Sequence, residues 1–345
     1  MGGFPGILCF DRMPVPRIWG GRRLWRRLRL PGGPGGDLEG RSPIAGTAAP
    51  PIGESWEIHD REGRSSILRS AFGLEAELPG LDLRSLVEGA SEALLGESPP
   101  DAFGRFPLML KFLDTGEDLS LQLHPDHETA RGLGAADAGK HESWCVLSCE
   151  PGAELHLGLA PGVGVEDFFA LLEEGGDPRD LMNRYEPRPG EVYDLPPGCL
   201  HCLGAGLTLY ECQENSDLTY RLHDWGRLGL DGRPRELHLE AARAAIRPRA
   251  RGGRVAGPET EGVLLEHEAF RLERLFLEGP ASVESEDRFG LLTLLEGEAV
   301  LRAGRQRGRL RAFETAVLSA SAGSVEIRPE GGPATLLLTR PPAKD

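Results

Sequence analysis

The chain has 345 residues, of which 39% are hydrophobic, and it carries 39 Lys plus Arg against 54 Asp plus Glu, for a formal charge of −15. This charge argues against nucleic acid or an anionic membrane as a partner. The length predicts about two domains, and the hydrophobic fraction excludes disorder of the whole chain. Only three of the basic residues are lysines, and the other 36 are arginines; the lysines are Lys111, Lys140 and Lys344.

We expect a cytoplasmic protein without a membrane span. The apolar run at residues 106–113 is much shorter than the ~20 residues that cross a bilayer. The first ten residues lack the basic and apolar regions of a secretory signal, and Gly6 stands where a myristoylation motif carries Ser or Thr. Six cysteines are too few for a disulfide scaffold, so we expect reduced thiols.

The pattern of the chain predicts a mainly β protein. Its 47 glycines and 28 prolines recur between short apolar stretches, as they do between short strands. Residues 190–198 and 263–277 alternate as half-buried strands do, and residues 291–304 resemble a hairpin. Three segments predict helices: residues 81–95, where Asp82 can cap the first turn, residues 165–172 and residues 235–246.

Two segments rich in Gly, Pro or Arg, residues 31–53 and 247–262, predict loops. We place the domain boundary in the second one. The expected organisation is a catalytic domain at residues 1–250, with helical insertions near residues 75–100, 126–138 and 164–185, then a linker at 251–262 and a second β domain at 263–345. That last segment holds a single histidine, His267, and is expected to bind no metal.

Residues 116–125 carry the first candidate site. Strand alternation places Ser120, Gln122 and His124 on one face, because side chains at i, i+2 and i+4 project the same way. Gln and His on one face can bind one metal ion. An amphipathic edge strand with a solvated polar face explains the same pattern.

Residues 190–206 carry the second candidate site. A strand runs into a Pro/Gly turn that ends at His201, with Ala205 four residues later. This segment and residues 116–125 resemble the two cupin motifs, with Gln122 in place of the usual first histidine. The resemblance implies small antiparallel barrels in which His124 and His201 face each other across the interior.

Two further segments add charged groups. In residues 138–144, Glu142 is a hard oxygen donor and Lys140 lies on the same side; a surface ion pair is the alternative interpretation, but Trp144 indicates a partly buried strand. In a chain that otherwise uses Arg, Lys140 indicates a need for a compact ammonium group. Residues 207–227 place Glu211 and Arg221 soon after His201.

In this order the segments resemble the type I phosphomannose isomerases, also called mannose-6-phosphate isomerases, of the shorter bacterial form. The resemblance covers roughly residues 14–246 well and the rest weakly. It is carried by the following motifs: PRIWGG (16–21), GESWEI (53–58), FPLMLKFLD (106–114), LSLQLHP (119–125), GKHESW (139–144), LPPGCLH (195–201), ENSDLTYRLHDW (214–225) and RELHLEAA (235–242).

The resemblance implies two cupin-like (jelly-roll) β-barrels with a small helical insertion, and one Zn²⁺ per chain. It implies a cytoplasmic isomerase, monomeric or homodimeric, that interconverts mannose 6-phosphate and fructose 6-phosphate through a cis-enediolate. The implied metal ligands are Gln122, His124, Glu142 and His201. The implied catalytic residues are Arg221, Glu211 and Lys140, and the implied substrate-binding residues are Ser120, Lys111 and Arg17.

Three alternatives stay open at this stage. Two histidines and a carboxylate also form the ligand set of an iron-dependent cupin oxygenase. A catalytically silent sugar-phosphate-binding cupin would keep the same fold. The C-x-x-C sequence at Cys199 and Cys202 is also typical of redox or zinc sites, but no second such pair supports that interpretation.

Overall fold

The computed structural model describes residues 4–28, 51–72, 80–250 and 252–342. The chain divides into two compact units, each assembled from separate stretches of sequence. The first unit comprises Met1–Met13, Trp56–Leu110 and Glu259–Asp345, and the second comprises Pro14–Ser55 and Lys111–Pro258. The prediction of a mainly β chain with cupin-like barrels is confirmed, and the strand pairings are antiparallel.

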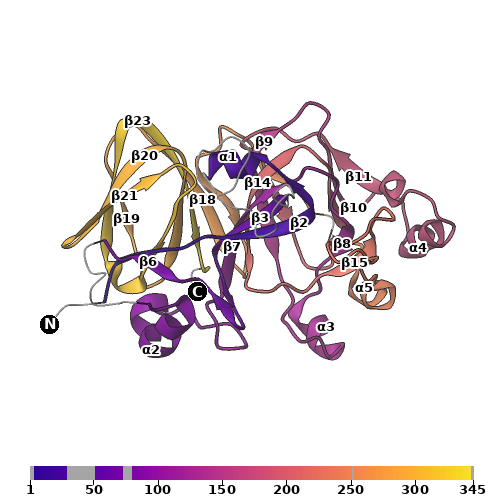
Figure 1. Ribbon diagram of the computed structural model, residues 1–345, viewed down its shortest axis with the longest axis horizontal. Helices are drawn as coiled ribbons and strands as arrows, with labels where there is room; N and C mark the ends of the chain where they lie inside the picture. Colours follow the sequence, from indigo (N-terminus) through magenta and orange to yellow (C-terminus); the bar gives the residue numbers. More distant parts are fainter. Residues whose placement is uncertain (1–3, 29–50, 73–79, 251, 343–345) are drawn as a thin grey trace, which may run out of the picture. The chain divides into compact units, whose positions relative to one another are not determined.

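The first unit contains a nine-stranded sheet that curves into a barrel, in which the N-terminal strand pairs with a strand more than 300 residues later (Figure 1). Along the main path its strands are β17 (Gly262–Glu266), β18 (Arg271–Leu277), β23 (Ser324–Arg340), β20 (Gly290–Ala303), β22 (Thr315–Leu318), β1 (Ile7–Phe10) and β6 (Leu68–Ser70); β19 (Ala281–Glu284) pairs with β23, and β21 (Gln306–Arg311) pairs with β20. A small separate sheet joins β4 (Asp60–Arg61) to β5 (Arg64–Ser65).

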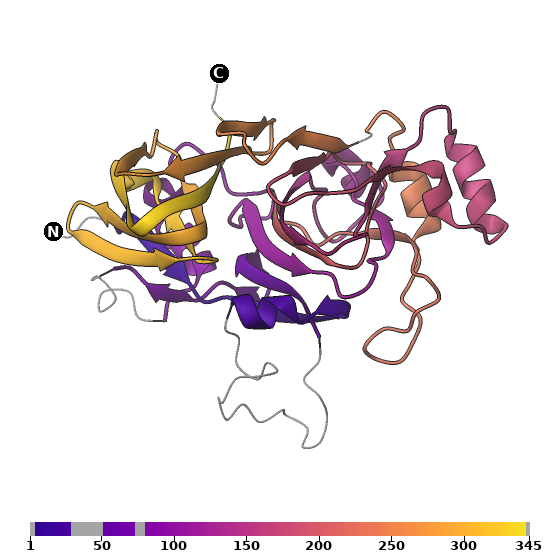
Figure 2. The ribbon, with the colours of Figure 1, turned by 90° about the horizontal axis from the view of Figure 1, so that it is seen from above.

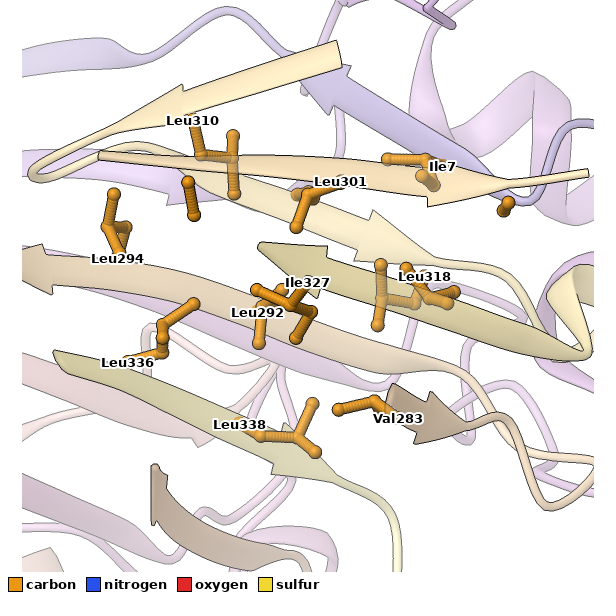
Figure 3. Close-up of a cluster of buried hydrophobic side chains, with 14 of the residues drawn as sticks. Ile7, Val283, Leu292, Leu294, Leu301, Leu310, Leu318, Ile327, Leu336 and Leu338 are labelled. Atoms are coloured by element: carbon orange, nitrogen blue, oxygen red, sulfur yellow. The ribbon is translucent and has the colours of Figure 1, made fainter. Parts of the chain in front are cut away.

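Apolar side chains fill the interior of this barrel. Leu292 and Leu301 of β20 and Ile327 and Leu336 of β23 are fully buried in one cluster inside the barrel (Figure 3). Alternation along each strand sends one set of side chains inward, where their burial is the main favourable contribution to folding.

The hairpin predicted at residues 291–304 is wrong, because these residues form one continuous strand, β20. Gly297 has a φ of +85°, and the register toward β23 shifts on both sides of Glu296. A positive φ at a glycine and an extra residue mark a β-bulge, which bends a strand without reversing it. The bulge lets the first half of β20 pair with β22 and the second half with β21.

The first unit also contains helix α2 (Leu83–Leu95) and the short 3₁₀ helix η3 (Ala320–Ala322), which pack together. The predicted helix at residues 81–95 and its cap are confirmed. The Asp82 carboxylate accepts hydrogen bonds from the Ser85 backbone N–H at 2.8 Å and from its hydroxyl at 2.7 Å.

The second unit contains two sheets that face each other around one interior, and Figure 2 looks along the ring of strands. The five-stranded sheet has the order β11 (Met182–Tyr185), β10 (Leu155–Leu159), β13 (His201–Leu203), β8 (Leu121–Leu123) and β15 (Tyr220–His223). The seven-stranded sheet, most of whose residues belong to the second unit, has the order β16 (Gly253–Ala256), β12 (Val192–Leu195), β9 (Glu142–Cys149), β14 (Leu207–Glu214), β7 (Leu108–Asp114), β3 (Ile52–Ile58) and β2 (Met13–Gly21).

Apolar residues of both sheets pack together in the second unit. Leu155 and Leu203 of the five-stranded sheet share one buried cluster with Trp144, Val146 and Leu209 of the seven-stranded sheet. Among its described residues, this unit also contains the helical segments α1 (Arg23–Arg27), α3 (His127–Gly132), α4 (Val165–Glu173), η2 (Pro178–Leu181) and α5 (Leu239–Ala245). The helix predicted at residues 165–172 is confirmed, whereas the one predicted at 235–246 is shorter.

The two predicted loop segments differ from the structure in part. Most of residues 31–53 lies outside the described residues, but Ile52 and Gly53 already belong to β3. The segment 247–262 is not a loop throughout, because it contains β16, which pairs with β12. The chain passes from the second unit to the first after Pro258, and the first unit also takes up residues 1–13 and 56–110.

In the described part of the chain, the helices are too short or too polar to span a lipid bilayer.

The cap of α2 gives a test of the first unit. Replacing Asp82 with Ala removes the acceptor for the Ser85 N–H, so we expect the free energy of unfolding to fall by about 1 kcal/mol. Glu92→Ala, an exposed change in the same helix, serves as the control and should shift stability by less than about 0.5 kcal/mol. Urea-induced unfolding measures both, and equal stabilities would contradict the capping role.

Candidate metal centre

Three neighbouring strands of the five-stranded sheet bring polar side chains together on the inside of the second unit. Gln122 on β8 lies opposite His201 on β13 and opposite Arg221 on β15. The predicted alternation is confirmed here, because Leu121 and Leu123 are fully buried in the apolar cluster on the other face of β8. Since His124 follows β8 directly, two candidate ligands come from one strand and its end.

His124, Glu142 and His201 form a buried group whose candidate ligand atoms all lie within 4.8 Å of one another. The Glu142 carboxylate lies between the imidazoles, with one oxygen 3.2 Å from His124 Nε2 and the other 3.5 Å from His201 Nε2. None of the three is more than 3% exposed. Two imidazole nitrogens and a carboxylate at this spacing can hold one metal ion.

Backbone carbonyls fix the orientation of both imidazoles. Nδ1–H of His124 donates to the Leu218 carbonyl at 2.8 Å, and Nδ1–H of His201 donates to the Cys199 carbonyl at 3.0 Å. Each ring therefore turns the lone pair of Nε2 toward Glu142. His124 Nε2 is buried and has no hydrogen-bond partner among the described residues. Outer hydrogen bonds of this type are typical of metal-binding histidines.

The protonation states of these groups also favour metal binding. Burial and the nearby Lys140 ammonium lower the pKa of His124 to about 4, and burial also lowers the pKa of His201. Burial alone would raise the pKa of Glu142, but Lys140 and His124 outweigh it and hold that pKa well below its usual range. At neutral pH the group is two neutral imidazoles and one carboxylate, which is the form that binds a metal ion.

A chain of hydrogen bonds connects this group to Arg221. The Gln122 amide lies 3.2 Å from His201 Nε2, and its oxygen accepts from the Ser120 hydroxyl at 3.1 Å. The same hydroxyl accepts from Nε–H of Arg221 at 3.2 Å. The predicted ligand Gln122 thus lies between the histidines and the predicted catalytic arginine.

The facing strands β9 and β14 supply buried polar side chains on the opposite side of the interior. Glu211 lies opposite Trp144, and Gln213 lies opposite Glu142. The Glu211 carboxylate accepts from the Trp144 indole N–H at 2.9 Å and lies 3.2 Å from Lys111 Nζ. These contacts hold the predicted base in one orientation.

Two lysines lie beside these side chains, Lys111 on β7 and Lys140 just before β9, as the scarcity of lysine in the sequence indicated. Lys140 Nζ lies 2.9 Å from Glu142, and both lysines also donate to Gln213 Oε1. Burial by itself would lower the pKa of Lys111, but the carboxylates of Glu211 and Glu54 outweigh it and raise that pKa above its usual value. Lys111 therefore stays charged although it is only 4% exposed.

Arg221 differs from the other arginines near the site. Among the described residues no carboxylate lies within ion-pair distance of it, whereas Arg227 and Arg235 both pair with Asp224. Burial and the neighbouring Arg235 lower the pKa of Arg221, which remains a guanidinium at neutral pH. Its uncompensated charge is suited to an anionic ligand.

Arg17 is held more firmly than the sequence indicated. It forms a two-pronged ion pair with Glu54, at 2.9 and 3.0 Å. Its side chain crosses β3 at Gly53, where an added Cβ would lie 2.6 Å from Arg17 Cβ. The arginine still lines the cavity, but its charge is compensated.

Most of the residues of this centre line a cavity of about 260 Å³, whereas His124 and His201 are not among its lining residues. The predicted site residues Arg17, Lys111, Ser120, Gln122, Lys140, Glu142, Glu211 and Arg221 all line it. Sequence reasoning missed other lining residues, namely Glu54, Trp144, Asp217, Arg235 and His238, and it also missed the buried amide of Gln213. Strand alternation could have found Gln213, which is two residues after Glu211 and on the same face.

The cysteines near His201 are buried thiols. Cys202 Sγ–H donates to the Leu119 carbonyl at 3.4 Å, and Cys199 Sγ–H donates to the Leu200 carbonyl at 3.4 Å. Burial raises the pKa of both thiols. A thiolate is the reactive and metal-binding form of cysteine, so these positions favour packing over redox chemistry.

The lowered histidine pKa values predict how acid affects the metal-free protein. In the unfolded chain these imidazoles have pKa values of about 6.5, so below that pH the unfolded state binds more protons than the folded state. The contribution of these imidazoles to the free energy of unfolding is therefore fully present above about pH 6.5, and it is lost as the pH falls toward the pKa of His124 in the folded state, about 4. We expect a loss of roughly 3 kcal/mol across this range from His124.

Urea unfolding at pH 7 and pH 5 in the presence of a chelator measures the effect. His124→Asn should flatten the pH dependence, since it removes the titrating ring. A stability that is independent of pH between 7 and 5 in the parent protein would show that the histidines are not buried in neutral form.

Comparisons with known proteins identify the family of the chain. Residues 41–143 match the family model described as phosphomannose isomerase type I, catalytic domain. The mannose-6-phosphate isomerase ManA of Bacillus subtilis is 30% identical over 303 residues, which cover 86% of this chain and 88% of that protein.

Solved structures show the same fold. The crystal structure of the mannose 6-phosphate isomerase from Bacillus subtilis superposes with a TM-score of 0.80 at 26% identity, covering 97% of this chain and 99% of that one. A zinc-bound mannose 6-phosphate isomerase superposes with a TM-score of 0.69 at 18% identity, covering 98% of this chain and 100% of that one. By sequence along most of its length and by fold, the chain belongs to the type I phosphomannose isomerase family.

Proposed function

We propose that the chain interconverts mannose 6-phosphate and fructose 6-phosphate through a cis-enediolate, with one zinc ion in the second unit. The observation that carries the proposal is the buried group of His124, Glu142 and His201 beside uncompensated positive charge, in a chain 30% identical to a mannose-6-phosphate isomerase. The oriented Nε2 atoms and the orphaned His124 nitrogen fit a metal ion.

The proposed zinc ligands are Gln122, His124, Glu142 and His201. Nitrogen and oxygen donors of this kind suit zinc. Gln122 would bind through its amide oxygen, whereas its nitrogen now faces His201, so we infer that the amide rotates when the ion binds. After rotation its N–H groups can donate to Ser120 Oγ. Bound zinc would supply fixed positive charge next to a developing oxyanion.

Glu211 is the proposed base. Isomerisation moves a proton from C2 of the aldose to C1 of the ketose, and a carboxylate can accept the proton at one carbon and return it at the other. Glu211 is fixed by Trp144 and Lys111, so it needs little reorganisation before proton transfer. Protons on the two sugar oxygens must also exchange, because the carbonyl moves from C1 to C2.

Arg221 and Lys140 are the proposed stabilisers of the anionic intermediate. Both are preorganised before substrate arrives, Arg221 by the Ser120 hydroxyl and the Glu236 carbonyl and Lys140 by Glu142 and Gln213. Ser120, Lys111 and Arg17 are the proposed substrate contacts. A phosphate near Arg17 would have to compete with Glu54 for the guanidinium, so we expect Arg17 to contribute less to phosphate affinity than an unpaired arginine would.

Two other functions remain to be separated by experiment. An iron-dependent oxygenase would use His124, Glu142 and His201, but Arg221 and Lys140 favour a sugar anion over oxygen activation. A silent sugar-phosphate-binding protein would bind substrate without turnover. The buried group of His124, Glu142 and His201 lies next to a cavity lined by Glu142, Lys140, Glu211 and Arg221, and this combination of ligands and charged groups argues for turnover.

The role of Arg221 predicts a large kinetic effect. Arg221→Ala removes a preorganised charge, so kcat on mannose 6-phosphate should fall by about 10²- to 10³-fold with zinc still bound. Arg243→Ala, which removes a surface arginine paired with Glu166, is the control and should stay within about twofold of the parent protein. Near-normal turnover by Arg221→Ala would contradict the role.

The metal requirement gives the direct test of function. A chelator should abolish isomerase activity on mannose 6-phosphate, and added Zn²⁺ should restore it, with one zinc per chain by elemental analysis. Bound iron together with oxygen consumption and no isomerase activity would establish the oxygenase instead. Zinc binding without turnover would favour the silent binding protein.

A further inference from the structure

Gln213 is a fully buried amide whose orientation is fixed by the backbone. It lies near the end of β14, and its Nε2 donates to the carbonyls of Glu214, at 2.9 Å, and Ser216, at 2.5 Å. Because both carbonyls can only accept, the nitrogen end of the amide is identified. The oxygen Oε1 must therefore point the other way.

Two ammonium groups converge on that oxygen. Lys111 Nζ donates to it at 2.8 Å and Lys140 Nζ at 3.0 Å. Each lysine also faces its own carboxylate, Glu211 for Lys111 and Glu142 for Lys140. Gln213 thus stands between the ion pair that contains the proposed base and the ion pair that contains the proposed metal ligand.

We propose that Gln213 is a positioning residue, which holds Lys111 and Lys140 on separate carboxylates and keeps both charges available to the reacting sugar. This inference rests on the proposed function. Two buried like charges repel strongly at short range, and each ammonium needs acceptors for its hydrogens. One shared neutral oxygen provides an acceptor for both without cancelling either charge.

The amide is chemically suited to this task where other side chains are not. An apolar residue would leave both ammonium groups short of an acceptor in a buried site, which is costly. A carboxylate would accept from both lysines but would compensate part of their charge and would place an oxygen against the Ser216 carbonyl. Gln213 should therefore act on the transition state, in which negative charge develops, more than on substrate binding.

The test compares kcat and KM on mannose 6-phosphate for three variants in the zinc-loaded protein. Gln213→Leu and Gln213→Glu should each lower kcat by at least about tenfold, with KM within about threefold and zinc content unchanged. Thr208→Val is the matched control: Thr208 is also fully buried on β14, and its hydroxyl has no hydrogen-bond partner among the described residues. It should behave like the parent protein.

A double-mutant cycle shows whether Gln213 acts through the lysines. In a Lys111→Met background, Gln213→Leu should cost clearly less than in the parent protein, roughly threefold instead of tenfold. The same cost in both backgrounds would overturn the inference, as would a Gln213→Leu protein that matches Thr208→Val or a Gln213→Glu protein with the parent rate. Lack of activity in the parent protein itself would instead refute the proposed function.

Discussion

The buried carboxylate of Glu142 is the interaction on which the rest of the site depends. A lone anion at 1% exposure would be strongly unfavourable, and this one is compensated by Lys140 and by the two imidazoles beside it. Lys140 in turn needs a second hydrogen-bond acceptor, which is the side-chain oxygen of Gln213. The same oxygen accepts a hydrogen bond from Lys111, which forms an ion pair with Glu211. The proposed metal ligands and the proposed base therefore belong to one buried polar network.

The barrel of the second unit makes this network possible by bringing two sheets face to face. One sheet contributes Gln122, His201 and Arg221 at paired positions, and the other contributes the paired residues Glu142 and Gln213, with Glu211 two residues before Gln213 on β14. The remaining interior is packed with leucines, tryptophans and valine. A rigid apolar base of this kind keeps the polar groups at fixed separations, which electrostatic catalysis requires.

Local patterns in the sequence predicted much of this arrangement. Alternation around Gln122, the turn before His201 and the rarity of lysine are each visible in the sequence itself, and the structure brings Gln122, His201 and Lys140 together around Glu142. Contacts between distant segments could not be read in the same way. The pairing of β1 with β22, the bulge at Gly297 and the Arg17–Glu54 ion pair depend on register and packing across the fold. Gln213 was missed because its role depends on its contacts with Lys111 and Lys140. Lys111 lies about a hundred residues earlier on another strand, so the sequence does not show that contact.

We propose that the network around Glu142 holds a zinc ion through nitrogen and oxygen atoms. Anomalous diffraction at the zinc edge from zinc-loaded crystals tests it directly. We expect one strong peak at about 2.0–2.2 Å from His124 Nε2, His201 Nε2 and a Glu142 oxygen. A peak at the sulfurs of Cys199 or Cys202, or no peak beside Glu142, would contradict the account.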